Sequence, residues 1–314
     1  MPRIGSMASA LPSITVPRAP ANLSYRYPLR NTATSPVSAA WLSTYAPAGP
    51  VQFVPNDGLY TSRRITSTRR MFEFASFFND PDIALWDTSS VTDMGYMFYG
   101  CSFFNQNIGN WNTSRVTKMD GLFNGAPQFN QNIGNWNTSN VTTTLAMFFQ
   151  AYAFNQVLNW DTSKVTTMRL MFGSAQGFNS PILFDTGNVT DISLMFSNAI
   201  AFNQPLTINT KNVTTMNSTF NGASIFNQSL STWITSKVTD MNSMFSNTNA
   251  FNQSLSTWDT HLVTDMGYMF NSANAFNQNL SGWCVTNIPT IPAGFADSAP
   301  AWTLPKPVWG TCPA

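Results

Sequence analysis

The sequence has few charged residues for its length. Only 9% of its 314 residues are Asp, Glu, Lys or Arg, whereas an ordinary globular domain has about 25%. Asn, Thr and Ser stand in their place, and 43% of the residues are hydrophobic, which is ample for a core. Uncharged polar side chains can line up on identical neighbours without like-charge repulsion, so this composition favours a structure built of stacked repeats.

The few charges are spread unevenly along the chain. Residues 1–70 carry eight basic residues against Asp57 alone, a net charge of +7, whereas the remainder carries seven basic and 13 acidic residues, a net charge of −6. This asymmetry indicates a basic arm on an acidic body. No aromatic interleaving or binding motif accompanies the arginines, so we expect protein partners rather than a specific nucleic acid. The candidate arm or assembly contacts are Arg3, Arg18, Arg26, Arg30, Arg63, Arg64, Arg69 and Arg70.

Histidine and cysteine are scarce as well. His261 is the only histidine and the chain has three cysteines, so a metal cluster or a Ser-His-Asp triad has almost nothing to build on. A Gly-rich phosphate loop is also missing from the sequence. We therefore expect no catalytic residue, no metal and no cofactor, and a protein that is not an enzyme.

Paired carboxylates are the one enzymatic alternative. Three pairs lie six residues apart, and other repeats have Asn, Thr or Lys at the same positions, which favours helix capping and turn formation. A polysaccharide-active enzyme would need two unlike carboxyl environments in a cleft, and no loop has a recognised Ca²⁺ spacing. The pairs are Asp87 and Asp93, Asp185 and Asp191, and Asp259 and Asp265.

Long apolar runs are absent. No stretch of 18 apolar residues occurs, so no membrane span is expected. Prolines at positions 2, 12, 17 and 20 break the apolar stretches of the first 20 residues, so we expect no secretory signal there. Residues 1–60 are rich in Pro, Ala and Ser but retain hydrophobic residues, and we interpret them as an extended arm, with a disordered linker as the alternative.

Repetition is what the sequence has in abundance. The eleven residues FNQNIGNWNTS occur at 104–114 and again at 129–139. A Phe-Asn step recurs every 24 to 26 residues, followed by a large apolar residue, by Val-Thr and by a Met-Phe-like pair. Such a period indicates a repeat architecture, here about nine coils over residues 61–285. The steps begin at Phe78, Phe104, Phe129, Phe154, Phe178, Phe202, Phe226, Phe251 and Phe276.

Each coil is expected to hold one short strand and one short helical turn. The segment L-x-x-W-x-T predicts the strand, and Thr followed by M-x-x-M-F predicts one or two helical turns. The Asn of each Phe-Asn step can bind backbone groups of adjacent coils and form a ladder. Stacked strands lie about 4.8 Å apart, so nine coils would make a rod roughly 40–45 Å long. The predicted fold is an α/β-type, leucine-rich-repeat-like solenoid.

Residues 286–314 are interpreted as the C-terminal cap that such a stack requires. They are rich in Pro and contain Phe295, Trp302 and Trp309. Cys284 and Cys312 enclose a loop of about 28 residues, for which a disulfide would contribute roughly 3–4 kcal/mol in the chain-entropy treatment. Two free thiols in a reducing compartment are the alternative. Cys101 lies where other coils have a small residue and is expected to be buried and inert.

With these repeats assembled, residues 61–314 resemble the BspA-like leucine-rich-repeat surface proteins. The resemblance rests on the unit F-N-Q…W-[DN]-[TV]-S-x-V-T-x-M…M-F and on the ending GWCVTNI…P-V-W-G-T-C-P. It implies a surface or secreted protein that acts in adhesion and partner binding, and such repeats also occur in large DNA viruses and phages. No catalytic residue comes with the resemblance.

Two non-enzymatic functions follow from these observations. The first is a rigid repeat scaffold for protein–protein contact or adhesion at a cell or particle surface, which the resemblance favours. The second is a structural component of a virion or other large assembly, anchored to neighbouring subunits by the basic arm. The expected location is correspondingly extracellular, on the cell surface or in a virion, and the chain could form oligomers.

Overall fold

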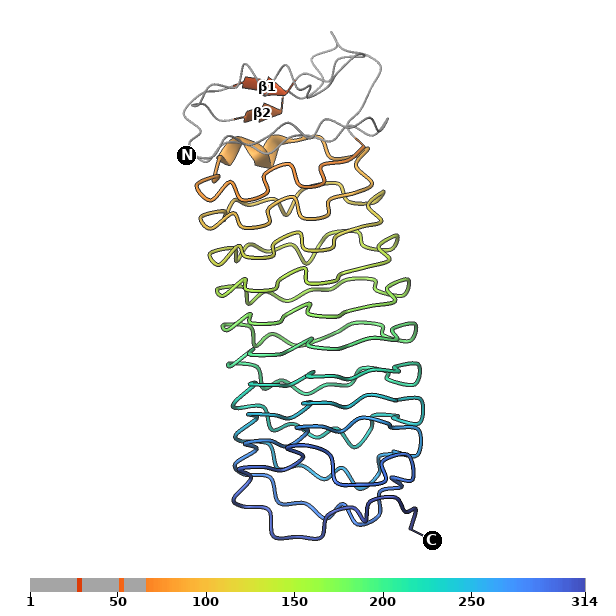
Figure 1. The fold of residues 1–314 in the computed structure, drawn as a ribbon. Coiled ribbons are helices and arrows are strands. Elements are labelled where there is room, and N and C mark those ends of the chain that lie inside the picture. Colours follow the sequence, from red (N-terminus) through yellow and green to blue (C-terminus); the bar gives the residue numbers. More distant parts are fainter. Residues whose placement is uncertain (1–26, 30–50, 54–65, 314) are drawn as a thin grey trace, which may run out of the picture.

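The computed structural model describes residues 27–29, 51–53 and 66–313. Strand β1 (Tyr27–Leu29) pairs in parallel with strand β2 (Val51–Phe53). The short 3-10 helix η1 (Pro81–Leu85) begins after Asp80, whose side chain accepts a hydrogen bond from the backbone N–H of Asp82. From residue 66 onward the chain winds into a long stack of coils (Figure 1).

Neighbouring coils are joined by parallel backbone pairing. Bridges link residues 24 to 26 positions apart, from Ser67 and Asp93 to Asp240 and Asp265. Beside them runs a column of exposed threonines, in which both the N–H and the hydroxyl of Thr117 donate to the carbonyl of Thr92. The N–H contact recurs along the stack, and the hydroxyl contact accompanies it at every step except that of Thr166, so each Val-Thr step is fixed in register with the preceding one. The column comprises Thr66, Thr92, Thr117, Thr142, Thr166, Thr190, Thr214, Thr239 and Thr264.

The helical turn predicted after each Val-Thr step is not found; linked β-turns take its place. In the coil of residues 94–101, the N–H groups of Met97, Tyr99 and Cys101 each donate to the carbonyl three residues earlier. Tyr96 and Gly100 have positive φ values of 56° and 70°, which an α-helix does not permit. Two such residues four positions apart recur in every coil, up to Gly294 and Ser298.

In the described coils, the predicted strand at L-x-x-W-x-T is reduced to one bridge, between Leu158 and Ile182. The described coils therefore contain turns and single bridges, with η1 as their one helical segment. The assignment to a leucine-rich-repeat-like α/β class remains a prediction.

Three columns of aromatic rings fill the core of the stack. Phe98 stacks on Phe104 of its own coil at 3.8 Å and on Phe123 of the next coil at 5.7 Å between ring centroids. Trp111 lies 6.3 Å from Trp136 with the two rings almost parallel. These side chains are at most 4% exposed. Since burying one such side chain stabilises a fold by about 1.5–3 kcal/mol, the columns contribute a large share of the apolar stabilisation, together with the buried Val, Met, Leu and Ile residues.

The predicted asparagine ladder is confirmed. The side-chain oxygen of Asn105 accepts hydrogen bonds from the backbone N–H of Asn130 and from the amide of Gln131, at 3.0 and 2.9 Å. The backbone contact repeats from Asn79 to Asn277, where Thr303 of the cap becomes the donor. Each Phe-Asn step thus satisfies a backbone donor of the following coil.

The cap is a modified last coil. Phe270 donates its backbone N–H to the carbonyl of Phe295, and the rings of Phe276 and Trp302 meet edge to face at 4.8 Å and 86°. This edge-on contact ends the face-to-face stacking. Pro289 stands 25 residues after Thr264 and has no N–H to extend the threonine column. The boundary predicted at residue 286 therefore falls inside a coil that still follows the repeat.

Gly121 provides a test of the turn geometry. Its φ is +57°, and a methyl group there would lie 2.3 Å from the ring of Tyr96 in the preceding coil. Gly121→Ala should therefore lower the free energy of unfolding by about 2–4 kcal/mol, part from backbone strain and part from overpacking. Chemical denaturation of the single variant and of Gly121→Ala in a Tyr96→Ala background measures the two parts.

Removal of the Tyr96 ring should rescue the overpacking part, about 1–2 kcal/mol. Gly282→Ala is the matched control, because an added Cβ there meets nothing within 4 Å. Equal effects of Gly121→Ala in both backgrounds would contradict the described contact between the two coils.

Candidate interaction surfaces

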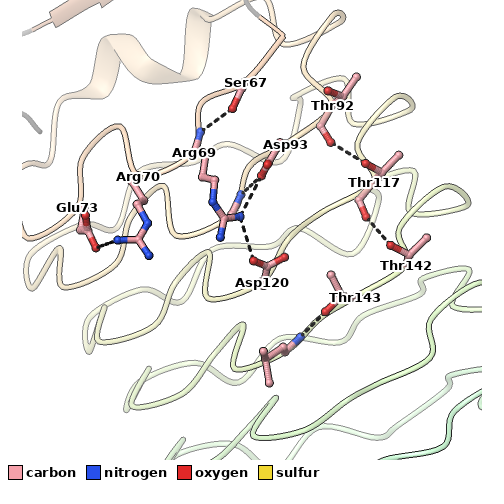
Figure 2. Close-up of polar contacts among 12 residues, drawn as sticks. Ser67, Arg69, Arg70, Glu73, Thr92, Asp93, Thr117, Asp120, Thr142 and Thr143 are labelled. Carbon is pink, nitrogen blue, oxygen red and sulfur yellow. Dashed lines mark hydrogen bonds and ion pairs between the residues drawn. The ribbon is translucent and has the colours of Figure 1, made fainter. Parts of the chain in front are cut away.

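A small charged cluster lies in and beside the linked β-turns of the first three coils (Figure 2). The Arg69 guanidinium contacts Asp120 at 3.0 Å and Asp93 at 3.5 Å, which lie in the two following coils. Arg70 pairs with Glu73 at 3.1 Å, and both guanidinium groups lie 5.2 Å from the centre of the Tyr96 ring. Arg69 therefore ties three successive coils together, and these two predicted contact residues have partners within the chain.

The other predicted contact arginines fall outside the described residues. These are Arg3, Arg18, Arg26, Arg30, Arg63 and Arg64. The same holds for most of the predicted arm at residues 1–60, of which only the backbones of β1 and β2 are described. The arm as an assembly contact accordingly remains a prediction.

The aspartate pairs make turns. The Asp259 carboxylate accepts from the backbone N–H of His261 at 3.2 Å, and the Asp265 carboxylate accepts from the backbone N–H of Gly267 at 2.8 Å. Asp87, Asp93, Asp185 and Asp191 each hold the backbone two residues later in the same way. Every aspartate of the three pairs thus stabilises a local turn, as the turn interpretation predicted.

His261 is the one histidine, and it pairs with Asp259. Its Nδ1 lies 2.6 Å from the Asp259 carboxylate, and both side chains are 47% exposed. Desolvation raises the pKa of Asp259, but the hydrogen bonds from His261 outweigh it, so that this pKa lies below its ordinary value. No grouping of three or more potential metal ligands occurs within residues 66–313.

The cysteines divide into a bonded pair and a buried thiol. Cys284 and Cys312 form a disulfide across the cap. Cys101 is fully buried and its thiol donates to the carbonyl of Phe72 at 3.0 Å. Burial raises the pKa of this thiol well above its usual range, which disfavours the reactive thiolate. The prediction that Cys101 is buried is confirmed.

Between Asp87 and Trp283, charge is confined to one part of each coil, which is not predicted above. Every charged residue there lies in the stretch from just after the Trp position to the second positive-φ residue. The other part of each of these coils contains no Asp, Glu, Lys, Arg or His. Because successive coils are stacked in register, these parts form a continuous band, here named the charge-free strip. It comprises residues 101–111, 126–136, 151–160, 175–184, 199–208, 223–233, 248–258 and 273–283.

One protein family matches the repeated part of the chain. The model of a family described as "Mycoplasma protein of unknown function, DUF285" matches residues 66–159, 156–208 and 206–302. The chain belongs to this DUF285 family. The three matches follow one another along the stack, which supports a protein built of tandem repeats. No curated protein and no solved structure matches the chain.

The DUF285 match does not single out the BspA-like proteins, so that narrower resemblance stays a prediction. The family is described as having unknown function, and the match therefore leaves partners and activity open. Within residues 66–313 no helix is both long and apolar enough to span a bilayer.

Counting the free thiols tests the disulfide between Cys284 and Cys312 in the cap. Alkylation of the unfolded, unreduced chain should modify one of the three cysteines, and alkylation after reduction should modify all three. Replacing Cys284 and Cys312 by Ala should lower the free energy of unfolding of the cap by roughly 3–4 kcal/mol, measured by hydrogen exchange of residues 285–313. Three modified cysteines in the unfolded, unreduced chain would contradict the disulfide.

Asp265 tests the turn role of the aspartates. Asp265→Asn keeps a side-chain oxygen that can accept from Gly267, so the free energy of unfolding should change by less than about 0.5 kcal/mol. Asp265→Ala removes the acceptor and should cost about 1 kcal/mol. Denaturant titration of both variants measures the difference. An equal loss in Asp265→Asn and Asp265→Ala would show that the charge, and not the turn, matters.

Proposed function

We propose that this DUF285 chain is a non-enzymatic repeat scaffold, whose outer surface makes protein–protein or adhesive contacts at a cell or particle surface. The stack of coils would be a rigid solenoid in this role. The observation that carries the proposal is the regular use of side chains: Phe, Trp, Val and Met columns form the core, and Asn and Thr columns join the coils. What remains outside is a long surface with the same positions repeated at each coil.

The local chemistry is consistent with this role. Each candidate catalytic aspartate already holds a turn, and His261 pairs with a single exposed carboxylate. Binding surfaces of stacked repeats are extended, and each coil contacts only its neighbours. Exposed positions can therefore change from coil to coil without loss of the stack. Leu183, Ile200 and Lys211 differ from the residues of neighbouring coils in this way.

Chemical cross-linking on intact cells or particles that carry the chain tests the scaffold role. A reagent that cannot cross membranes and reacts with amines should link the exposed Lys164, Lys211 and Lys237 to other proteins at the surface. A chain that stays unlinked inside the cell would contradict the surface role. Turnover of a polysaccharide by the purified chain, lost in Asp259→Asn or Asp265→Asn, would contradict the non-enzymatic role.

A virion or other large assembly is the second candidate, and one observation favours it. The first 70 residues carry a net charge of +7, which suits contact with acidic neighbouring subunits. Quantitative mass spectrometry of purified particles distinguishes the two. A fixed ratio of this chain to the particle's main protein would support the assembly, whereas its recovery in the envelope or medium would support the surface scaffold.

A further inference from the structure

The charge-free strip is a surface that suits an uncharged partner. Among the large apolar side chains that the structure exposes between residues 101 and 283, most lie on this strip. Five of them lie in its middle coils: Tyr152, Val157, Leu183, Ile200 and Ile225, which are 41–58% exposed. The prolines at positions 181 and 205 are exposed in the same coils. This group is here named the central apolar patch.

The position of the patch within the strip is informative. The strip has eight segments, and the patch occupies the third to the sixth of them. It is therefore centred on the midpoint of the strip, between residues 175–184 and 199–208. In a pair with two-fold symmetry the same surface is used on both subunits, and a two-fold axis through this midpoint brings each patch against its copy.

The charge distribution favours the same pairing. A surface that carries charges brings like charges together near the axis when it meets its own copy, and this opposes association. The strip has no charged side chain to desolvate or repel. In the other part of these coils, every segment except residues 137–150 carries at least one Asp or Lys. The strip thus suits contact with its own copy better than the charged part of the coils does.

The size of the strip is sufficient for a stable pair. Eight coils at about 4.8 Å and about seven extended residues across give an area roughly 38 Å by 20–23 Å, or about 800 Å². A standard protein–protein interface buries about 800 Å² on each partner.

We propose that two copies of this chain pair side by side through the charge-free strip, with the central apolar patches in contact. The pairing deepens the proposed scaffold function and rests on it, because it names the partner of one surface. Pairing through the strip would leave the charged part of the coils, which includes the linked β-turns, free for other contacts on both copies.

Sedimentation velocity of the full chain tests the pairing at about 1 to 100 µM. The wild-type chain should sediment as a dimer with twice the 34.7 kDa mass of one chain. Its dissociation constant should change little between about 50 and 500 mM salt, because no charge pair lies in the contact. Association that weakens steeply with salt would show pairing through the basic N-terminal residues instead, and would overturn the proposal.

Charge variants locate the contact. Leu183→Lys combined with Ile200→Lys should raise the dissociation constant about 100-fold, because like charges then meet near the axis. Ile234→Lys combined with Leu262→Lys is the matched control, since these residues are 50% and 41% exposed outside the strip. The control should stay dimeric, and thermal unfolding should confirm that both variants fold.

A mixing experiment completes the test. The double-lysine chain and a chain with Leu183→Asp and Ile200→Asp should each be monomeric, and should form a mixed dimer when combined. A wild-type chain that is monomeric throughout, or a double-lysine variant that pairs like the control, would overturn the proposal. A monomer that binds a neutral polysaccharide through Leu183 and Ile200 would assign the strip to a glycan. A monomer that still cross-links to another protein would overturn the pairing and leave the scaffold function intact.

Discussion

The structure depends on the hydrogen bonds that each coil makes with the next. Phe98 donates its backbone N–H to Leu122 of the following coil, and Thr117 donates back to Thr92 of the preceding one. A single coil can satisfy few of these groups by itself, and an unpaired buried backbone group costs about 1–3 kcal/mol. Coils must therefore superpose, and superposition requires the same residue types at the same positions. The repeated FNQNIGNWNTS follows from this requirement.

The same constraint explains how the stack ends. A regular edge leaves a row of unpaired groups and flat ring faces on which another coil could add. At the C-terminal end, Trp302 turns its ring edge-on to Phe276, and Pro289 offers no donor to Thr264. The Cys284–Cys312 disulfide then closes the loop that covers this end. The cap thus keeps the shape of a coil while removing the features that would let the stack continue.

The sequence predicts the columns better than it predicts the backbone between them. The Asn105 ladder and the buried Trp111 follow directly from the period, because a residue present in every coil must meet its copies. The sequence predicts a helix where the structure has turns, because Met94 and Met97 are both buried and their spacing suits a helix as well as a β-turn. Positive φ at Leu170 or Tyr96 has no signal in residue type, since neighbouring coils supply the bonds that hold it.

Two further features can be recognised only when the coils are aligned in register. Ala299 and Trp302 keep the spacing of Ala273 and Phe276, and this match would have revealed the modified coil in the cap. The charge-free segments can also be read from the sequence, but only coils in register turn separate uncharged stretches into one strip. The pairing of Arg69 with Asp93 and Asp120 requires the same register, because these residues are 24 and 51 positions apart.

Removal of one whole coil is the measurement that tests this account most directly. Deletion of residues 129–153 joins Gln128 to Phe154, so that every column continues across the junction. The shortened chain should fold cooperatively, keep its near-ultraviolet circular dichroism and be about 4.8 Å shorter by X-ray scattering. Deletion of residues 129–140 alone breaks every column and should abolish the aromatic signal. If both deletions unfolded the chain, or both were tolerated, the claim that register between coils holds the structure together would be contradicted.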